Sequence, residues 1–198
     1  YGSTGHDDSH INFWNVHTLL VQGELVNYNG ERVQQTTSLL QDFITAALAL
    51  ALPVHLVTLG YLVDITAALG CCLLGTALAR RLAPRLAGWA TWLALSCSNF
   101  LLWAYGGMGA PLAAFVLLVA IHSWWQWLSL AQPGPRDFLR LAAVTVAVVL
   151  VRPEMPIVAT AITTALTVFF WRQPALRARC LLLAGLTTAA MALLFLWQ

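Results

Sequence analysis

The chain begins with a polar stretch and continues as a series of long apolar segments. Charged and amide side chains gather between residues 5 and 35, and apolar side chains dominate the remainder. Several of the apolar segments approach the roughly 20 residues that a transmembrane helix requires, although some are shorter. They are Leu56–Ala79, Leu86–Tyr105, Pro111–Leu130, Phe138–Val151, Met155–Trp171 and Cys180–Trp197. The pattern predicts an all-α fold, a polytopic transmembrane helix bundle with about six spans in residues 54–198.

Two shorter helices are predicted in residues 1–53, ahead of the bundle. In the segment Ile11–Gln22, the apolar residues Phe13, Val16 and Leu20 recur at helical spacing between polar neighbours. This pattern is typical of a short helix that lies at a membrane surface. The segment Thr36–Leu52 is apolar and helical but short, so it suits either a short span or a helix half-inserted into the outer leaflet. The positions of the arginines in the later connections favour the half-inserted helix. Residues 1–53 are therefore expected to form an outer-face loop with juxtamembrane helices.

Composition and charge placement agree with a membrane protein and give it an orientation. Hydrophobic residues make up 60% of the chain and charged residues 9%, against about 25% charged in a soluble domain. All the basic residues are arginines, and most of them lie in every second connection, which the positive-inside rule assigns to the cytoplasm. They are Arg80, Arg81, Arg85, Arg136, Arg140, Arg172, Arg177 and Arg179. The polar N-terminal stretch is then extracytoplasmic, and the absence of a basic stripe with interleaved aromatics argues against a nucleic-acid partner.

The adjacent carboxylates of Asp7 and Asp8 are the leading candidates for chemistry. A carboxylate at the edge of a low-dielectric region can have a raised pKa and accept a proton, which suits general acid–base catalysis. The alternative is a solvated loop or the N-terminal cap of a helix. His6 and His10 flank the pair, so binding of a divalent cation is a further alternative.

Arg152 and Asp64 are charged residues in apolar surroundings. A charge near bilayer depth costs about 2.5–3.5 kcal/mol on insertion scales, so Arg152 needs a partner. Glu154, an acidic residue of the first loop or an anionic ligand could supply it. The sequence Arg152-Pro153-Glu154 suits a phosphate clamp or a simple helix boundary, and Asp64 suits either structural pairing or a functional role.

Taken in order, these motifs resemble those of the class C (GT-C fold) membrane glycosyltransferases that use polyprenyl-phosphate sugars. The similarity is greatest to the branch that includes bacterial arabinofuranosyltransferases. Members carry an Asp-Asp pair, a short helix, a segment like N-x-G-E-R-V, a Thr-rich stretch, and later glycine-containing and R-P-E loops. The corresponding segments here are Asp7-Asp8, Asn27–Val33, Thr36–Leu39, Gly107–Pro111 and Arg152-Pro153-Glu154.

The resemblance implies an inverting sugar transfer at the outer face of a bacterial cytoplasmic (inner) membrane, with no required cofactor. Asp7 would deprotonate the acceptor hydroxyl, Asp8 would orient the acceptor or sugar, and Arg152 and Arg32 would bind the donor phosphate. The remaining candidate site residues are supporting ones: Glu31, Glu154 and His10. The expected partners are a polyprenyl-phosphate sugar, membrane lipids, an acceptor glycan, lipid or protein, and other membrane subunits.

One departure from the family pattern keeps an alternative open. Gly109 stands where the family often has glutamate, and the chain is short for this class. Both features favour a non-catalytic structural subunit of a membrane complex, while Asp64 suggests a transporter. The chain does not start with methionine, so we expect it to be part of a larger protein.

Overall fold

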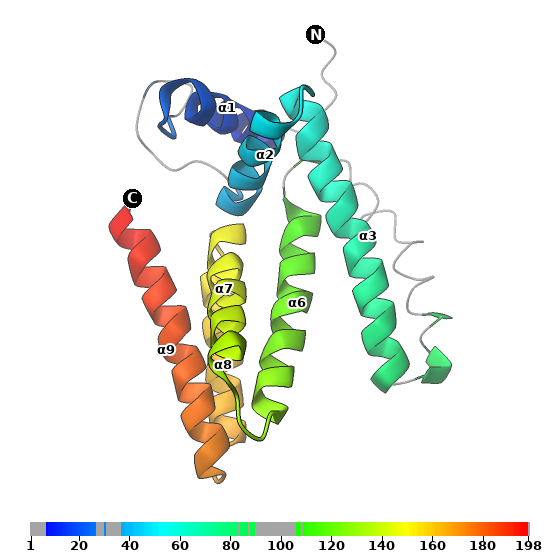
Figure 1. The fold of residues 1–198 in the computed structure, drawn as a ribbon, viewed down its shortest axis with the longest axis vertical. Helices are drawn as coiled ribbons and strands as arrows, with labels where there is room; N and C mark the ends of the chain where they lie inside the picture. The colour runs from blue at the N-terminus through cyan, green and yellow to red at the C-terminus, as the bar shows by residue number, and fades with distance from the viewer. Residues whose placement is uncertain are drawn as a thin grey trace. The chain divides into compact units, whose positions relative to one another are not determined.

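The chain folds into α-helices throughout the part that the structure, a computed structural model, describes. That part comprises residues 7–26, 30, 37–82, 84–86, 88–89, 106–107 and 109–197. Within it lie seven α-helices and a short 3-10 helix, η1 (Figure 1). They are α1 Asp7–Gln22, α2 Leu39–Ala51, α3 Leu56–Leu82, η1 Pro84–Leu86, α6 Ala110–Ser129, α7 Pro135–Val151, α8 Met155–Phe169 and α9 Pro174–Trp197. The prediction of an all-α fold is confirmed.

Three helices, α3, α6 and α9, are long and apolar enough to cross a membrane. Their surfaces are largely exposed, with Leu73 on α3 and Phe195 on α9 among the exposed apolar side chains. Large apolar side chains are stable on an outer surface when that surface contacts lipid. Three such helices indicate a multi-pass membrane protein.

The three other predicted spans, Leu86–Tyr105, Phe138–Val151 and Met155–Trp171, are not found as helices of full span length among the described residues. Helices form at two of them, but α7 has 17 residues and α8 has 15, short of the roughly 20 that a span requires. The break between α7 and α8 falls at Arg152, whose backbone is extended (φ −158°, ψ 150°). Pro153 follows it, and a proline disfavours helical backbone in the residue before it. The predicted span Leu86–Tyr105 falls mostly outside the described residues.

The chain comprises two compact units, Tyr1–Leu118 and Val119–Gln198. In the first unit, α1 packs against both α2 and α3. The Phe13 ring meets the Tyr61 ring edge-on at 5.9 Å between centroids, and it also lies directly over Gly60. Because Gly60 and Tyr61 belong to the first turns of α3, α1 packs at the N-terminal end of that helix.

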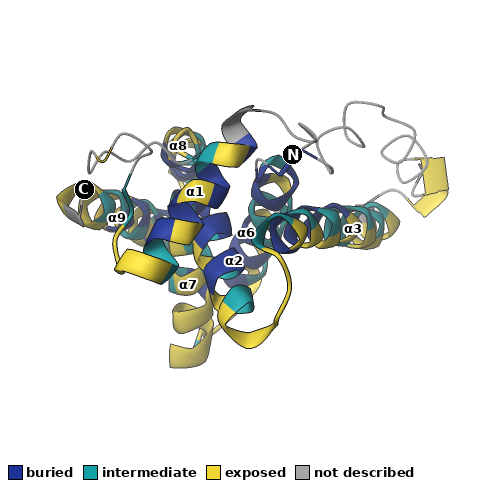
Figure 2. Ribbon diagram, turned by 90° about the horizontal axis from the view of Figure 1, so that it is seen from above, coloured by how far each residue is buried: buried dark blue, intermediate teal, exposed yellow. Residues whose placement is uncertain are grey.

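Packing of α1 corrects one detail of the predicted membrane-surface helix. The helix itself is confirmed and begins earlier, at Asp7. Its apolar residues Phe13 and Val16, however, are buried within the first unit, and Figure 2 shows buried and exposed residues alternating along α1. Helical periodicity reveals that a face is buried but not whether lipid or protein buries it. Here protein covers Phe13 and Val16, and the location of α1 at a membrane surface stays a prediction.

Helix α2 is short and is capped at its start. The Ser38 hydroxyl accepts a hydrogen bond from the backbone N–H of Gln41 at 3.2 Å, which is the usual role of serine at an N-cap. The 13 residues of α2 extend only about 20 Å. A short apolar helix at this place is confirmed, and its half-insertion into the outer leaflet stays a prediction.

The second unit comprises the C-terminal part of α6 together with α7, α8 and α9, and the last three contact one another pairwise (Figure 1). Small and β-branched residues such as Ala159, Thr163 and Thr187 are buried between them. The buried threonine hydroxyls donate to carbonyls of their own helices, for example Thr187 to Leu183 at 3.0 Å. A hydrogen bond to a carbonyl of the same helix allows each hydroxyl to lie inside an apolar bundle.

Arg179, near the start of α9, ties α9 to the C-terminal end of α6. Its guanidinium donates to the backbone carbonyls of Trp127 at 3.3 Å, Leu128 at 3.2 Å and Ala131 at 3.1 Å. The end of a helix leaves several carbonyls without intrahelical partners, and the planar fork of arginine is suited to several acceptors at once. Arg179 therefore fastens one end of the second unit.

Candidate functional site

The side of α1 that faces the protein carries a row of polar residues beside the buried Phe13 and Val16. Ser9, Asn12, Asn15 and Thr18 recur every third residue and are all buried. Buried polar side chains are stable only when they are hydrogen-bonded. The elements that pack against this side of α1 must therefore offer hydrogen-bond partners as well as a complementary shape.

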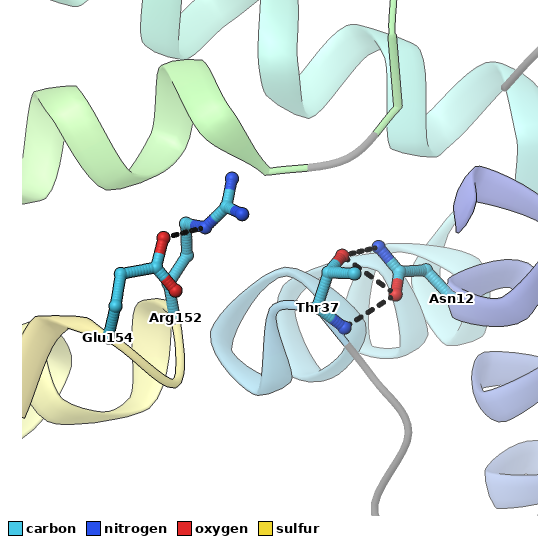
Figure 3. A network of polar contacts seen from close by, with 4 residues as sticks. All are labelled: Asn12, Thr37, Arg152 and Glu154. Carbon is cyan, nitrogen blue, oxygen red and sulfur yellow. Dashed lines mark hydrogen bonds and ion pairs between the residues drawn. The ribbon is translucent and has the colours of Figure 1, made fainter.

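Asn12 supplies the best-defined of these contacts, to Thr37 at the approach to α2 (Figure 3). Its amide nitrogen donates to the Thr37 hydroxyl at 2.8 Å, and its amide oxygen accepts from the Thr37 backbone N–H at 3.1 Å. The Thr37 hydroxyl also lies 3.1 Å from that oxygen. Asn12 lies little more than one turn after Asp7 and Asp8, so these bonds hold the beginning of α1 against the beginning of α2.

Asp64 of α3 forms the centre of a second buried network. Its Oδ2 accepts the Gly109 backbone N–H at 3.2 Å and the Gln41 side-chain amide at 3.4 Å. The same Gln41 amide lies 3.5 Å from the Gly60 carbonyl. Of the two roles that the sequence left open for Asp64, the structure shows structural pairing: the carboxylate joins α2, α3 and the residues before α6.

Gly107 and Gly109 both require glycine. Their φ angles are +67° and +71°, in the left-handed region that L side chains rarely adopt. A Cβ at Gly109 would lie 2.7 Å from both the Ser38 Cβ and the Gln41 Oε1. A glutamate, which the resemblance would place at 109, therefore has no room in this conformation.

Three motif segments that are far apart in the sequence meet in the first unit. Gly107 packs closely against Ser9 in the first turns of α1. A Cβ added to this glycine would lie 3.2 Å from the Ser9 Cβ. Gly109 packs against Ser38, and Thr37 bonds to Asn12. The segments after the acidic pair, before α2 and before α6 thus form one cluster at the N-terminal end of α3.

Arg152 terminates α7 in the second unit. Its Nε lies 2.7 Å from Glu154 Oε1, a close ion pair whose geometry is not that of a hydrogen bond. The two terminal guanidinium nitrogens point away from Glu154 (Figure 3). The side chains are 24% and 50% exposed, so both charges reach solvent. Of the partners predicted for Arg152, the structure supplies the local one.

Of the remaining predicted site residues, some lie in α1 and others lie outside the described part of the chain. Asp7 and Asp8 form the first residues of α1, as the helix-start alternative predicts for their backbone, and His10 is exposed. Glu31 and Arg32 lie outside the described residues. Asp7 belongs to the first unit and Arg152 to the second, and the structure describes each unit separately. Their meeting in one site therefore stays a prediction.

Among the described residues, no group of three or more His, Cys, Asp and Glu side chains is arranged to hold a metal ion. The proposed cation ligand His6 lies outside them. No metal is therefore assigned to the acidic pair.

Sequence reasoning missed Asn12 and Gln41, which carry much of the polar network. The available signal was the interruption of an apolar stripe by amides, at Asn12 and Asn15 in α1 and at Gln41 beside Asp42 in α2. An amide side chain within a buried helix face indicates a hydrogen-bonded contact between helices. Its partner depends on the fold.

Comparison of the chain with protein-family models, with curated proteins and with solved structures found no match.

Proposed function

We propose that the protein is a membrane glycosyltransferase that moves a sugar from a polyprenyl-phosphate donor to an acceptor hydroxyl on the extracytoplasmic side. The observation that carries this proposal is the cluster formed by the three motif segments. The packing brings together residues that are separated in the sequence, namely Ser9, Thr37, Ser38, Gly107 and Gly109. Convergence of distant polar segments beside a candidate span is expected of a site and is not required of a lipid-facing helix bundle.

The orientation rests on the arginines of α3. Arg80 and Arg81 occupy its last turn, and arginines at one end of a span favour the cytoplasmic side. The N-terminal end of α3, where α1 packs, then faces outward. This supports placing the acidic pair in the layer where a lipid-linked sugar presents its headgroup.

In the proposed reaction, the oxygen of the acceptor hydroxyl attacks the anomeric carbon of the donor. The carbon–oxygen bond to the phosphate breaks, and polyprenyl phosphate leaves with the bonding electron pair. The carboxylate of Asp7 accepts the hydroxyl proton, and Asp8 orients the sugar or acceptor. Attack from the face opposite the leaving group inverts the anomeric centre, and no cofactor is needed.

The phosphate is assigned to Arg152, assisted by Arg32. A guanidinium binds phosphate oxygens in a forked geometry that lysine cannot provide. The terminal nitrogens of Arg152 point away from Glu154 (Figure 3), which leaves that fork available to a ligand. Stabilising negative charge on the leaving group is commonly the largest single contribution to catalysis.

The test is Asp7→Asn, assayed for sugar transfer in membranes supplied with a radiolabelled polyprenyl-phosphate pentose and a saccharide acceptor. Removing a general base lowers the rate by about 10²–10⁴-fold, so we expect transfer to fall by at least a hundredfold. Asp137→Asn is the matched control, because this exposed carboxylate accepts from the Gly134 N–H at 2.9 Å and an asparagine oxygen can do the same. Undiminished transfer in Asp7→Asn would remove Asp7 as the base.

A second candidate is a non-catalytic structural subunit, and Gly109 is the observation that favours it. The close contacts of Gly109 with Ser38 and Gln41 exclude the family glutamate. A structural subunit would show no transfer in the unmodified protein, under conditions where a homologous glycosyltransferase is active. It would instead co-purify with partner subunits equally well with or without the Asp7→Asn change.

A further inference from the structure

The outer face of α1 carries an unusual stripe of side chains. His10, Trp14, His17 and Val21 follow one another at alternating steps of three and four residues, and all four are exposed. Such spacing places residues along one line of a helix. By the same spacing, residue 7 stands at the head of this line. The stripe therefore runs along α1 from the position of the proposed base.

Trp14 and His17 form the centre of the stripe. Trp14 is 43% exposed, and its ring lies 5.9 Å from that of His17 at an interplanar angle of 43°. The indole offers a flat apolar surface, and the two imidazoles offer hydrogen-bond donors and acceptors on either side of it. This combination fits a ligand with one apolar face and a rim of hydroxyl groups.

Charge distinguishes between the occupants of such a face. No Asp, Glu, Lys or Arg occurs from residue 9 to residue 23, whereas helices that bind anionic lipid surfaces carry Lys and Arg on their polar face. The apolar residues Phe13 and Val16, which would insert into lipid, are buried instead. An uncharged face with one exposed indole is complementary to a neutral polyhydroxylated ligand.

We propose that this stripe is the acceptor subsite, where a saccharide chain stacks on Trp14 and bonds to His10 and His17. The proposal rests on the function proposed above. Residues 7 and 14 are separated by about 10 Å along the helix axis, so the sugar on Trp14 is not the one that reacts. Trp14 would then select acceptors long enough to reach from the indole to the reacting hydroxyl.

The first test is direct binding without donor. A pentofuranose tetrasaccharide and the corresponding monosaccharide are titrated into the full chain in nanodiscs, with binding followed by saturation-transfer NMR. We expect the tetrasaccharide to bind and Trp14→Ala to raise its Kd by about tenfold, equivalent to about 1.4 kcal/mol. Trp14→Phe should retain most of the affinity. Trp125→Ala, which removes an indole that is 64% exposed on α6, should leave the Kd unchanged.

The second test is the transfer assay with acceptors of increasing length. Trp14→Ala should raise KM for the tetrasaccharide while leaving kcat and monosaccharide use unchanged, because stacking remote from the reaction affects binding alone. Equal tetrasaccharide binding by the wild-type and Trp14→Ala proteins would overturn the subsite, as would a brominated-lipid quenching component that is present in the wild type and lost in Trp14→Phe. Tetrasaccharide binding by a protein that transfers no sugar would instead overturn the proposed function and leave the subsite standing.

Discussion

Replacement of Gly109 by alanine tests the packing that joins α2, α3 and the residues before α6. Two costs are expected. An L side chain at a left-handed φ costs about 1–2 kcal/mol, and Gly109 has φ +71°. The new methyl group would also lie 2.7 Å from the Ser38 Cβ and the Gln41 Oε1, and overpacking of this kind costs about 1–3 kcal/mol. The free energy of unfolding should therefore fall by about 2–5 kcal/mol.

Gly23→Ala provides the matched control. Gly23 has a similar φ of +74°, but nothing lies within 4 Å of a Cβ built there. It should show only the conformational cost, about 1–2 kcal/mol. The difference between the two variants then isolates the steric contribution around Gly109.

The assay is equilibrium unfolding in mixed micelles, followed by helical circular dichroism. Comparison of two glycine-to-alanine variants cancels the effect that reduced backbone freedom has on the unfolded chain. Equal losses in Gly109→Ala and Gly23→Ala would mean that Ser38 and Gln41 move aside at little cost. That result would refute the argument that glutamate is excluded from position 109.

Two further variants test the other contacts. Asn12→Ala leaves the Thr37 N–H without its acceptor, so we expect a loss of about 1–3 kcal/mol and faster amide exchange in α1; an exchange pattern like that of the wild type would show that the bonds do not hold α1. Arg179→Lys keeps the charge but replaces a guanidinium that reaches several α6 carbonyls, so thermal stability should fall further than in Arg177→Lys. Equal melting temperatures for these two variants would contradict the fastening role of Arg179.

The helices were largely predictable because their signals are local. The presence of α3, α6 and α9 follows from long apolar runs, and the end of α7 follows from Pro153. The start of α9 does not, because the helix begins at Pro174, six residues before the predicted segment, and includes two arginines of the predicted connection. The partner of Arg152 was also predictable, since Glu154 is two residues away. In each case the deciding residues lie within a few positions of one another.

The contacts that form the cluster were not predictable in the same way. Asp64 and Gly109 are 45 residues apart, and no periodicity in either segment points to the other. Gly109 had drawn attention as a missing glutamate, whereas its surroundings show a backbone position that only glycine fits. The burial of Phe13 depended on Gly60 leaving space in another helix. Such contacts depend on long-range packing, which a single sequence does not encode in a recognisable pattern.

The Asp64 network bears on how the protein enters the membrane during synthesis. An aspartate in an inserting helix is costly, with a cost that reaches about 2.5–3.5 kcal/mol at the helix centre, and Asp64 lies in the first third of α3. One of its hydrogen-bond donors, Gln41, precedes it in the chain, whereas another, the Gly109 N–H, is synthesised 45 residues later. Helix α3 therefore gains by entering the bilayer together with α2 rather than alone. The bond from Gly109 can form only after the intervening chain has left the ribosome, so the first unit is completed late.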